Sequence, residues 1–161
     1  MKIGTKYFGE IECDSAEIIR FPDGLFGFEE EKEFFLLPFS TQGEDGAAVE
    51  GEPWLFSLQS VNTPGLAFVM VNPFVFDESY APALTPEELK KLGVEDSGDL
   101  YYYTMCVVRQ PTEDSTINLR CPVAINGDSY QAMQVILEND AYQMRSRLGD
   151  FTGGQEDEKK C

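Results

Sequence analysis

Apolar and polar residues alternate with a period of two in short runs along most of this chain. Between Trp54 and Ser60, for example, Trp54, Phe56 and Leu58 fall on one face of an extended backbone. Such alternation is typical of half-buried strands and not of helices. Turn residues such as Pro22-Asp23-Gly24 separate the runs. The pattern predicts strands at residues 3–7, 10–12, 17–21, 34–39, 54–60, 66–71, 100–109, 116–120, 122–126 and 130–137.

Several of these runs carry a further signal. Pro38 indicates an edge strand or a strand end, because proline cannot donate a ladder hydrogen bond. Residues 66–71 are apolar on both faces, which predicts the most buried strand. Pro122 predicts a kink in a strand that runs through residues 116–126. Residues 130–137 also suit a helix, but Asn126-Gly127 before them signals a type I′ hairpin and favours a returning strand.

Helical signals are confined to short segments. Thr85 can cap a helix, Pro86 suits its first position, and Glu88 completes a capping box with Thr85. Gly93 is expected to end this helix. Residues 139–148 could hold one further helical turn. The predicted fold class is therefore all-β, a small antiparallel β-barrel-like fold with one or two short helices.

The length of 161 residues fits one domain. No composition shift marks a boundary within the chain, so we expect a single domain over residues 1–150. Residues 41–52 are polar and glycine-rich, with four acids and no base, and are predicted to form a loop. Residues 151–161 are expected to be a flexible acidic tail.

The charge excludes several classes of partner. There are 29 acidic and 12 basic side chains, which gives a formal charge of −17. Nucleic acids and anionic membranes are repelled by such a field, because phosphate binding needs clustered Lys and Arg. A basic protein partner would instead be steered toward this chain.

Histidine and cysteine usage argues against catalysis and metal binding. The chain has no histidine, which removes Ser-His-Asp and Cys-His catalysis and histidine-ligated zinc. The four cysteines, at positions 13, 106, 121 and 161, form no CxxC pair. Cys106 and Cys121 lie in apolar runs and are expected to act as small buried side chains. These absences disfavour an enzyme without excluding one, since Asp, Glu, Tyr, Lys or Cys could still act as acid or base. The prediction is no enzyme, with no catalytic residues, no cofactor and no metal.

The N-terminal sequence lacks the apolar core of a signal peptide. The longest uninterrupted apolar stretch, residues 66–71, is far shorter than the ~20 residues of a membrane span. The expected location is the cytoplasm, with reduced thiols.

Three conspicuous segments have ordinary structural explanations. The glycines of residues 24–29 suit a tight turn better than a phosphate loop, with Phe26 and Phe28 expected in the core. The acidic run at residues 29–31 is typical of a solvated face. Tyr101-Tyr102-Tyr103 could stack on bases or sugars, but tyrosines on a strand more often lie half in the core.

The predicted partner surface follows the apolar run at residues 66–71. Phe74 and Phe76 stand beside Asp77 and Glu78, and apolar anchors with a charged rim are typical of interfaces. The alternative is that both phenylalanines belong to the core. We expect residues at nearby strand ends to complete this surface, namely Gln59, Ser60 and Asn72.

Five segments in order resemble the flagellar assembly factor FliW family. They are IIRFPDGLFGFEE (Ile18–Glu30), PWLFSLQS (Pro53–Ser60), LAFVMVNP (Leu66–Pro73), TINLRCPVAIN (Thr116–Asn126) and QVILENDAYQMRSRL (Gln134–Leu148). The resemblance extends to about Leu148. The acidic, glycine-rich segment at Gly43–Gly51 looks longer than in the family, and the tail ends in Cys161.

The resemblance implies a non-enzymatic cytoplasmic protein with a β-barrel-like fold. Members of the family bind the RNA-binding translational repressor CsrA and relieve its repression of flagellin mRNA. Inhibition is allosteric and noncompetitive. Flagellin is a competing partner, so that partner switching couples flagellin synthesis to its secretion. The acidic composition agrees with a basic, RNA-binding partner.

Two alternatives remain open from the residues alone. One is a carbohydrate-binding or carbohydrate-processing barrel that uses Tyr101–Tyr103 and a carboxylate pair, which would require a cleft with two facing acids. The other is an acidic mimic of nucleic acid that occupies an RNA site directly.

Overall fold

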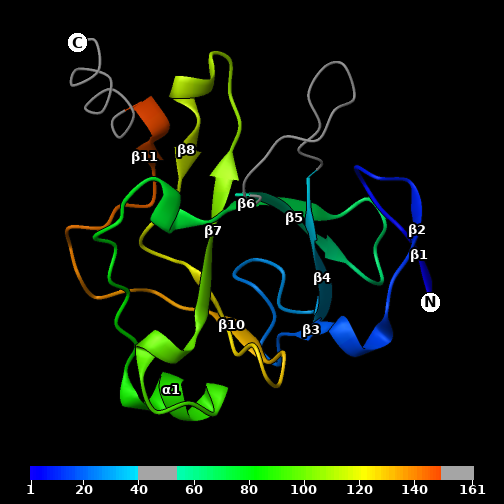
Figure 1. The fold of residues 1–161 in the computed structure, drawn as a ribbon, viewed down its shortest axis with the longest axis horizontal. Coiled ribbons are helices and arrows are strands. Elements are labelled where there is room, and N and C mark those ends of the chain that lie inside the picture. The colour runs from blue at the N-terminus through cyan, green and yellow to red at the C-terminus, as the bar shows by residue number, and fades with distance from the viewer. Residues whose placement is uncertain (40–53, 150–161) are drawn as a thin grey trace.

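The structure, a computed structural model, describes residues 1–39 and 54–149, and these residues form mainly short strands (Figure 1). One α-helix, α1 (Pro86–Leu92), lies among them, as do the 3₁₀ turns η1 (Ser15–Glu17), η2 (Pro73–Val75), η3 (Ser97–Asp99) and η4 (Thr112–Asp114). The strands are β1 (Lys2–Gly4), β2 (Glu10–Glu12), β3 (Ile19–Arg20), β4 (Glu33–Pro38), β5 (Leu55–Ser60), β6 (Ala67–Val71), β7 (Tyr101–Val107), β8 (Thr116–Ile117), β9 (Val123–Ile125), β10 (Ala132–Gln134) and β11 (Ser146–Arg147).

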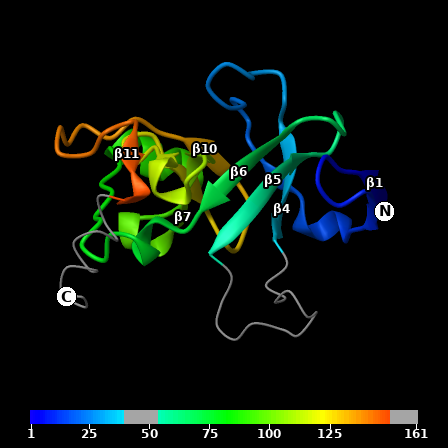
Figure 2. The same cartoon turned by 90° about the horizontal axis from the view of Figure 1, so that it is seen from above.

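Nine of these strands form one antiparallel sheet within the described residues. Its main path is β10-β9-β7-β6-β5-β4-β3, and β8 joins β7 to β11. The centre is a meander, since β5 pairs with β4 on one side and with β6 on the other. β1 and β2 form a separate hairpin. Figure 2 shows this hairpin at one end of the molecule and β11 at the other.

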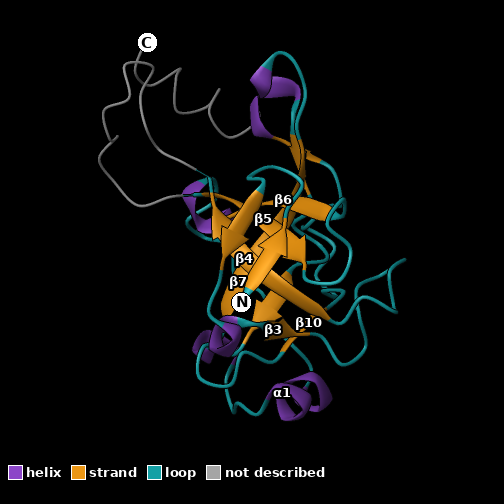
Figure 3. Cartoon of the chain, turned by 90° about the vertical axis from the view of Figure 1, so that its right-hand side faces the viewer, coloured by secondary structure: helices purple, strands orange, loops and turns teal. Residues whose placement is uncertain are grey.

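The sheet curls without closing into a barrel. Its two ends, β3 and β10, meet through a single parallel bridge between Arg20 and Gln131, in which the Arg20 N–H donates to the Tyr130 carbonyl at 2.9 Å. Figure 3 views the strands from the side and shows α1 beyond the edge of the sheet. The mainly-β class with a short helix is confirmed, but β3 has only two residues and cannot supply the ladder that closure requires.

The apolar side chains are divided between the two faces of the sheet. One cluster, around Val71, Tyr102 and Leu119, lies on the side of α1 and the C-terminal segments. A second cluster, around Phe21, Phe34 and Met70, fills the inside of the curl. A small third cluster of Ile3, Ile18 and Phe35 fixes the N-terminal hairpin to the outer side of β4. Neighbouring residues of β4 therefore serve different clusters, as the period-two alternation predicts.

The helix prediction is confirmed in detail. The Thr85 side chain accepts from the Glu88 N–H and the Glu88 carboxylate accepts from the Thr85 N–H, so the capping box is complete. Gly93 ends the helix in the left-handed conformation, with φ of 76°. All of these signals lie within nine residues, and none depends on distant packing.

The predicted type I′ turn at Asn126-Gly127 is wrong, although the returning strand β10 is confirmed. Neither residue has a positive φ, whereas Tyr130 does, at 60°. The connection runs from Asn126 to Gln131, joined by a bond from the Asn126 N–H to the Gln131 carbonyl at 2.9 Å. The buried Asn126 side chain accepts from Asp128 and Ser129 and donates to the Leu92 carbonyl, which stabilises this longer loop.

Other local predictions also need correction. Phe26 and Phe28 are 49% and 41% exposed, and it is Leu25 that reaches the core from this turn. Strand 66–71 is not the most buried, because Phe68 and Val69 are partly exposed while β9 is buried throughout. The run at residues 116–126 is two separate strands, β8 and β9, and not one kinked strand. Residues 146–147 belong to β11, and helical backbone begins only at Leu148, the last residue of the segment predicted to hold a helical turn.

The loop predicted at residues 41–52 and the tail at 151–161 lie outside the described residues.

Candidate functional site

The residues of the predicted partner surface lie at opposite ends of the β5–β6 hairpin. Asn72 follows β6, and its N–H donates to the Trp54 carbonyl at the start of β5. Gln59 and Ser60 end β5 beside the turn into β6, where Gln59 pairs with Ala67. The expectation that these two residues lie near Asn72 is wrong, because antiparallel pairing places the end of one strand beside the start of the next.

Gln59 and Ser60 are also fully buried. The Gln59 side-chain amide donates to the Ser60 carbonyl at 3.0 Å and to the Pro64 carbonyl at 3.1 Å, and its oxygen accepts from the Lys6 N–H at 2.9 Å. The Ser60 hydroxyl donates to the Glu31 carboxylate at 2.6 Å. Both side chains thus hold the turn together and have no surface to offer a partner.

The remaining predicted residues lie around η2 on a surface that we call the aromatic surface and define as Trp54, Phe74, Val75, Phe76 and the acids Asp77 and Glu78. Trp54, Phe74, Val75 and Glu78 are exposed, whereas Phe76 and Asp77 are partly buried, and Phe76 also packs against the cluster around Val71 and Tyr102. Trp54 and Phe76 stack edge to face with ring centroids 5.6 Å apart. Phe74 packs on Tyr80 at 5.7 Å and remains partly exposed. Trp54 and Val75 were not predicted from the sequence.

Local hydrogen bonds give this surface its shape. The Asn72 side chain accepts from the Phe74 N–H at 3.0 Å and caps η2, in which Pro73 occupies the first turn. The Asp77 carboxylate accepts from both the N–H and the hydroxyl of Ser79. Asn72 therefore positions the aromatic side chains, while Glu78 is exposed beside them.

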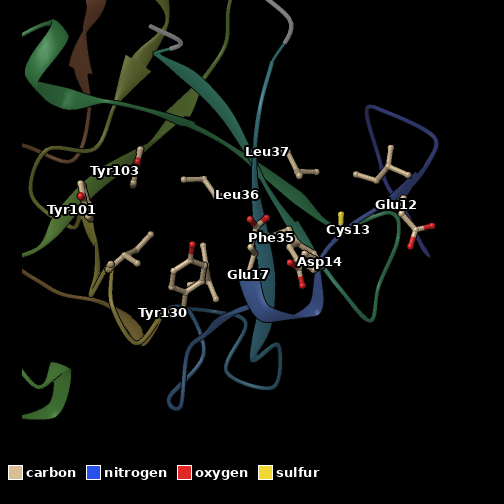
Figure 4. A pocket seen from close by; sticks show the side chains of 14 residues that line it. Glu12, Cys13, Asp14, Glu17, Phe35, Leu36, Leu37, Tyr101, Tyr103 and Tyr130 are labelled. Carbon is tan, nitrogen blue, oxygen red and sulfur yellow. The ribbon is translucent and has the colours of Figure 1, made fainter. Parts of the chain in front are cut away.

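A second candidate site is a groove of about 540 Å³ between the N-terminal segment and the curled sheet (Figure 4). Figure 4 shows Tyr101, Tyr103 and Tyr130 on one side and Glu12, Cys13 and Asp14 on the other, with β4 between them. Leu36 points toward the tyrosine side and Leu37 toward the acidic side. The groove was not predicted from the sequence, because its walls come from segments about 90 residues apart.

The groove does not support the carbohydrate hypothesis. Its acids, Glu12, Asp14 and Glu17, all come from one segment, and the side opposite Glu12 and Asp14 is lined by tyrosines, so the groove has no pair of acids on facing walls. Tyr101, Tyr102 and Tyr103, the run that could have stacked on sugars, do not form a shared platform either. Tyr102 is buried and donates to the Ser97 carbonyl at 2.6 Å, whereas Tyr101 is 60% exposed.

The cysteines lie in protected environments. Burial raises the pKa of the Cys106 thiol to about 11, and it also raises the pKa of Cys121. A raised pKa leaves little thiolate at neutral pH, and the thiolate is the reactive form. Cys121 is buried as predicted, whereas Cys106 is only partly buried. Cys161 lies outside the described residues.

Within residues 1–39 and 54–149, no group of three or more His, Cys, Asp or Glu side chains could hold a metal ion. None of the helices in the same ranges is long and apolar enough to cross a membrane.

Comparison with known proteins matches nearly the whole chain. The family model described as FliW protein matches residues 2–148. A flagellar assembly factor FliW from Geobacillus sp. (strain WCH70) is 40% identical over 148 residues, which cover 92% of this chain and 95% of that protein. The flagellar assembly factor FliW of Bacillus subtilis (strain 168) is 34% identical over 149 residues, covering 92% and 97%. A crystal structure of the flagellar assembly factor FliW superposes with a TM-score of 0.78 at 38% identity, covering 92% of this chain and 96% of that one.

The fold is a curled, open antiparallel sheet, and the composition is strongly acidic. Together with the aromatic surface, these features define a class of small, acidic, mainly-β binding proteins. Within that class, the chain belongs to the FliW family of flagellar assembly factors.

Proposed function

We propose that this chain binds a CsrA-type translational repressor and relieves its repression of flagellin mRNA, and that flagellin competes as a second partner. The observation that carries the proposal is membership of the FliW family over residues 2–148. The formal charge of −17 supports it, because repressors that bind RNA expose basic surface and acidic proteins are steered toward such surface. The chain acts as a binding protein in the cytoplasm, without catalysis or cofactor.

The mode of inhibition is allosteric and noncompetitive. The repressor then binds its RNA more weakly while this chain is bound, although this chain does not occupy the RNA site. Labelled flagellin leader RNA is titrated into the repressor at several fixed concentrations of this chain. The maximal bound fraction is expected to fall, and excess RNA does not restore it. Full recovery at high RNA would overturn this mechanism in favour of direct mimicry of nucleic acid.

The aromatic surface is the proposed contact for the repressor. Buried aromatic anchors surrounded by charge dominate many interfaces. Phe76→Ala is expected to weaken repressor binding by about tenfold or more. Asp77→Asn keeps the acceptor for Ser79 and removes the charge, so it is expected to lower the association rate at low salt.

The matched control is Phe26→Ala, which removes an exposed phenylalanine from a different turn. Thermal unfolding first confirms that each variant is folded. Isothermal titration then compares the affinities of the two variants for the repressor. Unchanged affinity in Phe76→Ala, or an equal loss in Phe26→Ala, would refute the assignment of the aromatic surface. Failure of the wild-type chain to change RNA binding would refute the proposed function itself.

A further inference from the structure

The groove beside β4 has one wall of three tyrosines, two of which are placed by close aromatic or backbone contacts. Tyr103 stacks edge to face on Phe56, with ring centroids 5.1 Å apart. Tyr101 lies against Gly127, where an added Cβ would come within 2.5 Å of the Tyr101 ring. Glycine at position 127 therefore allows the ring to approach the backbone. Both rings thus have defined positions on this wall before any ligand is present.

Tyr130 completes the wall from a strained backbone conformation. Its φ is 60°, in the left-handed region that is costly for a bulky residue other than glycine. The Tyr130 N–H donates to the Asn126 carbonyl at 2.8 Å, and its own carbonyl accepts from the Arg20 N–H at 2.9 Å. These bonds hold the loop in place on both sides. The result is a third aromatic ring that lines the groove (Figure 4).

The acids of the groove are not neutralised by the protein. Glu12 and Asp14 lie across from the tyrosines, and Glu17 lies between the two sides (Figure 4). Glu12 pairs with the ammonium of Met1 at 2.9 Å, but no ion pair joins Asp14 or Glu17 to a basic group of the described residues. A concave surface with one sign of charge concentrates counter-ions. The groove therefore favours a cation, and the tyrosine faces add cation–π attraction.

The hydrogen-bonding groups of the groove decide which kind of cation fits. Among the described residues that line it there is no Lys, Arg, Asn, Gln, Ser or Thr, so its side-chain donors are the tyrosine hydroxyls and the Cys13 thiol. A peptide brings a carbonyl acceptor with nearly every N–H, and the groove has few donors for them. An aliphatic polyamine brings donors only. Its methylene groups suit Leu36 and Ile125, which also line the groove.

We propose that this groove binds a linear aliphatic polyamine, with its ammonium groups at Asp14 and Glu17 and over the tyrosine rings. The volume of about 540 Å³ is that of a small-molecule site. The methylene groups lie against Leu36 and Ile125. The proposal goes beyond the proposed function, because it assigns a small-molecule ligand to a site other than the aromatic surface.

The first test compares two ions of equal charge. Spermidine is titrated into the isotopically labelled full chain in about 100 mM NaCl, which screens diffuse attraction. Amide shifts in nuclear magnetic resonance are expected to centre on Glu17, Gly127 and Tyr130. Hexaamminecobalt(III) carries the same triple charge without methylene groups and is expected to bind at least about tenfold more weakly. Equal binding of the two ions, or shifts spread over the whole acidic surface, would overturn the proposal.

Matched variants provide an independent measurement. Glu17→Gln is expected to weaken spermidine binding by about tenfold, because it removes a charge-assisted bond. Glu138→Gln removes an exposed acid outside the groove and is expected to leave the affinity nearly unchanged. Gly127→Ala changes no charge but displaces the Tyr101 ring, so a loss of about threefold is expected. Equal losses in the two glutamate variants, or no loss in Gly127→Ala, would overturn the proposal.

A blocked Lys-Lys-Lys peptide is the third probe. It has the same charge as spermidine but carries backbone carbonyls that the groove leaves without donors, so it is expected to bind at least about tenfold more weakly. Thermal unfolding first confirms that every variant is folded. Tighter binding of the peptide than of spermidine would overturn the proposal and assign the groove to a basic protein segment instead.

Discussion

At the scale of the single residue, Gly24 and Gly27 form a matched pair within one turn. Both have positive φ, at 71° and 85°. A Cβ on Gly24 would stand 2.5 Å from the backbone of Glu29, whereas a Cβ on Gly27 meets nothing within 4 Å. The two positions therefore separate the cost of the left-handed conformation from the cost of a backbone clash.

Gly27→Ala is expected to lower the free energy of unfolding by about 1 kcal/mol, the cost of positive φ alone. Gly24→Ala is expected to lower it by about 3 kcal/mol or more, because the turn must also open. Urea unfolding of the two variants measures the difference. Equal losses would show that the approach of Glu29 to Gly24 is not a constraint on the fold.

Single side chains also mark the limit of what the sequence predicted. Phe74, Phe76, Asp77 and Glu78 are neighbours in sequence, and the structure keeps them on one surface. Gln59 and Asn72 are separated by the register of the β5–β6 hairpin, which composition does not determine. Phe26 was expected in the core because it is large and apolar, but the turn directs Leu25 inward in its place.

At the scale of the element, the turn between β5 and β6 depends on one buried amide. Gln59 bonds the Ser60 and Pro64 carbonyls and accepts from Lys6, so it links the turn to the N-terminal segment. Gln59→Leu keeps the volume but leaves these groups without partners. The expected loss in the free energy of unfolding is about 2–3 kcal/mol.

The control for this variant is Gln143→Leu, because the side chain of Gln143 is exposed. It is expected to change the free energy of unfolding by less than about 0.5 kcal/mol. Hydrogen exchange should also quicken at the Lys6 amide in Gln59→Leu and not in the control. A stable Gln59→Leu variant with unchanged exchange would contradict the role of this amide.

Elements were predicted well where their signals are local. The helix α1 is bounded by Thr85, Pro86 and Gly93, each acting within a turn of the chain. The hairpin at Asn126 failed because the side chain of Asn126 bonds Leu92, which is 34 residues away. Pro38 did mark the end of β4, although β4 is not an edge strand because β3 and β5 pair with it on its two sides. The groove beside β4 needed residues 101–130 to approach residues 11–37, which only tertiary packing decides.

At the scale of the whole molecule, buried tyrosines make the fold sensitive to alkali. Burial raises the pKa of Tyr102 to about 12 and also raises the pKa of Tyr80 and Tyr103. The unfolded chain loses these protons near pH 10, before the folded chain does. The unfolded state therefore binds fewer protons between pH about 10 and about 12, and the free energy of unfolding falls as the pH rises through that window.

Tyr102→Phe tests this dependence. The variant loses the bond to Ser97, so its free energy of unfolding is lower at neutral pH by about 1 kcal/mol. Its further decline above pH about 10 is expected to be shallower than that of the wild-type chain, since one raised pKa is gone. Urea unfolding across pH about 8 to about 11 measures both slopes. Parallel slopes would exclude Tyr102 as a source of the alkaline loss.

The net charge of −17 is also expected to lower the stability of the whole molecule, because the fold contains few contacts that offset it. The described residues form five ion pairs, and in each of them at least one side chain is more than half exposed. Exposed pairs contribute little, so repulsion among the acids dominates the electrostatic free energy. Salt screens this repulsion in the folded chain and also screens the attraction between the chain and a basic partner.

Raising NaCl from about 20 mM to about 500 mM is therefore expected to increase the melting temperature of the free chain while weakening its complex with a CsrA-type repressor. The two trends have opposite signs and a common cause. Glu29→Gln combined with Glu30→Gln removes two exposed charges and should flatten the salt dependence of the melting temperature. Differential scanning calorimetry and titration at matched salt measure both. A melting temperature that falls with salt would mean that the five ion pairs outweigh the repulsion, because screening weakens both effects and the net change follows the larger one.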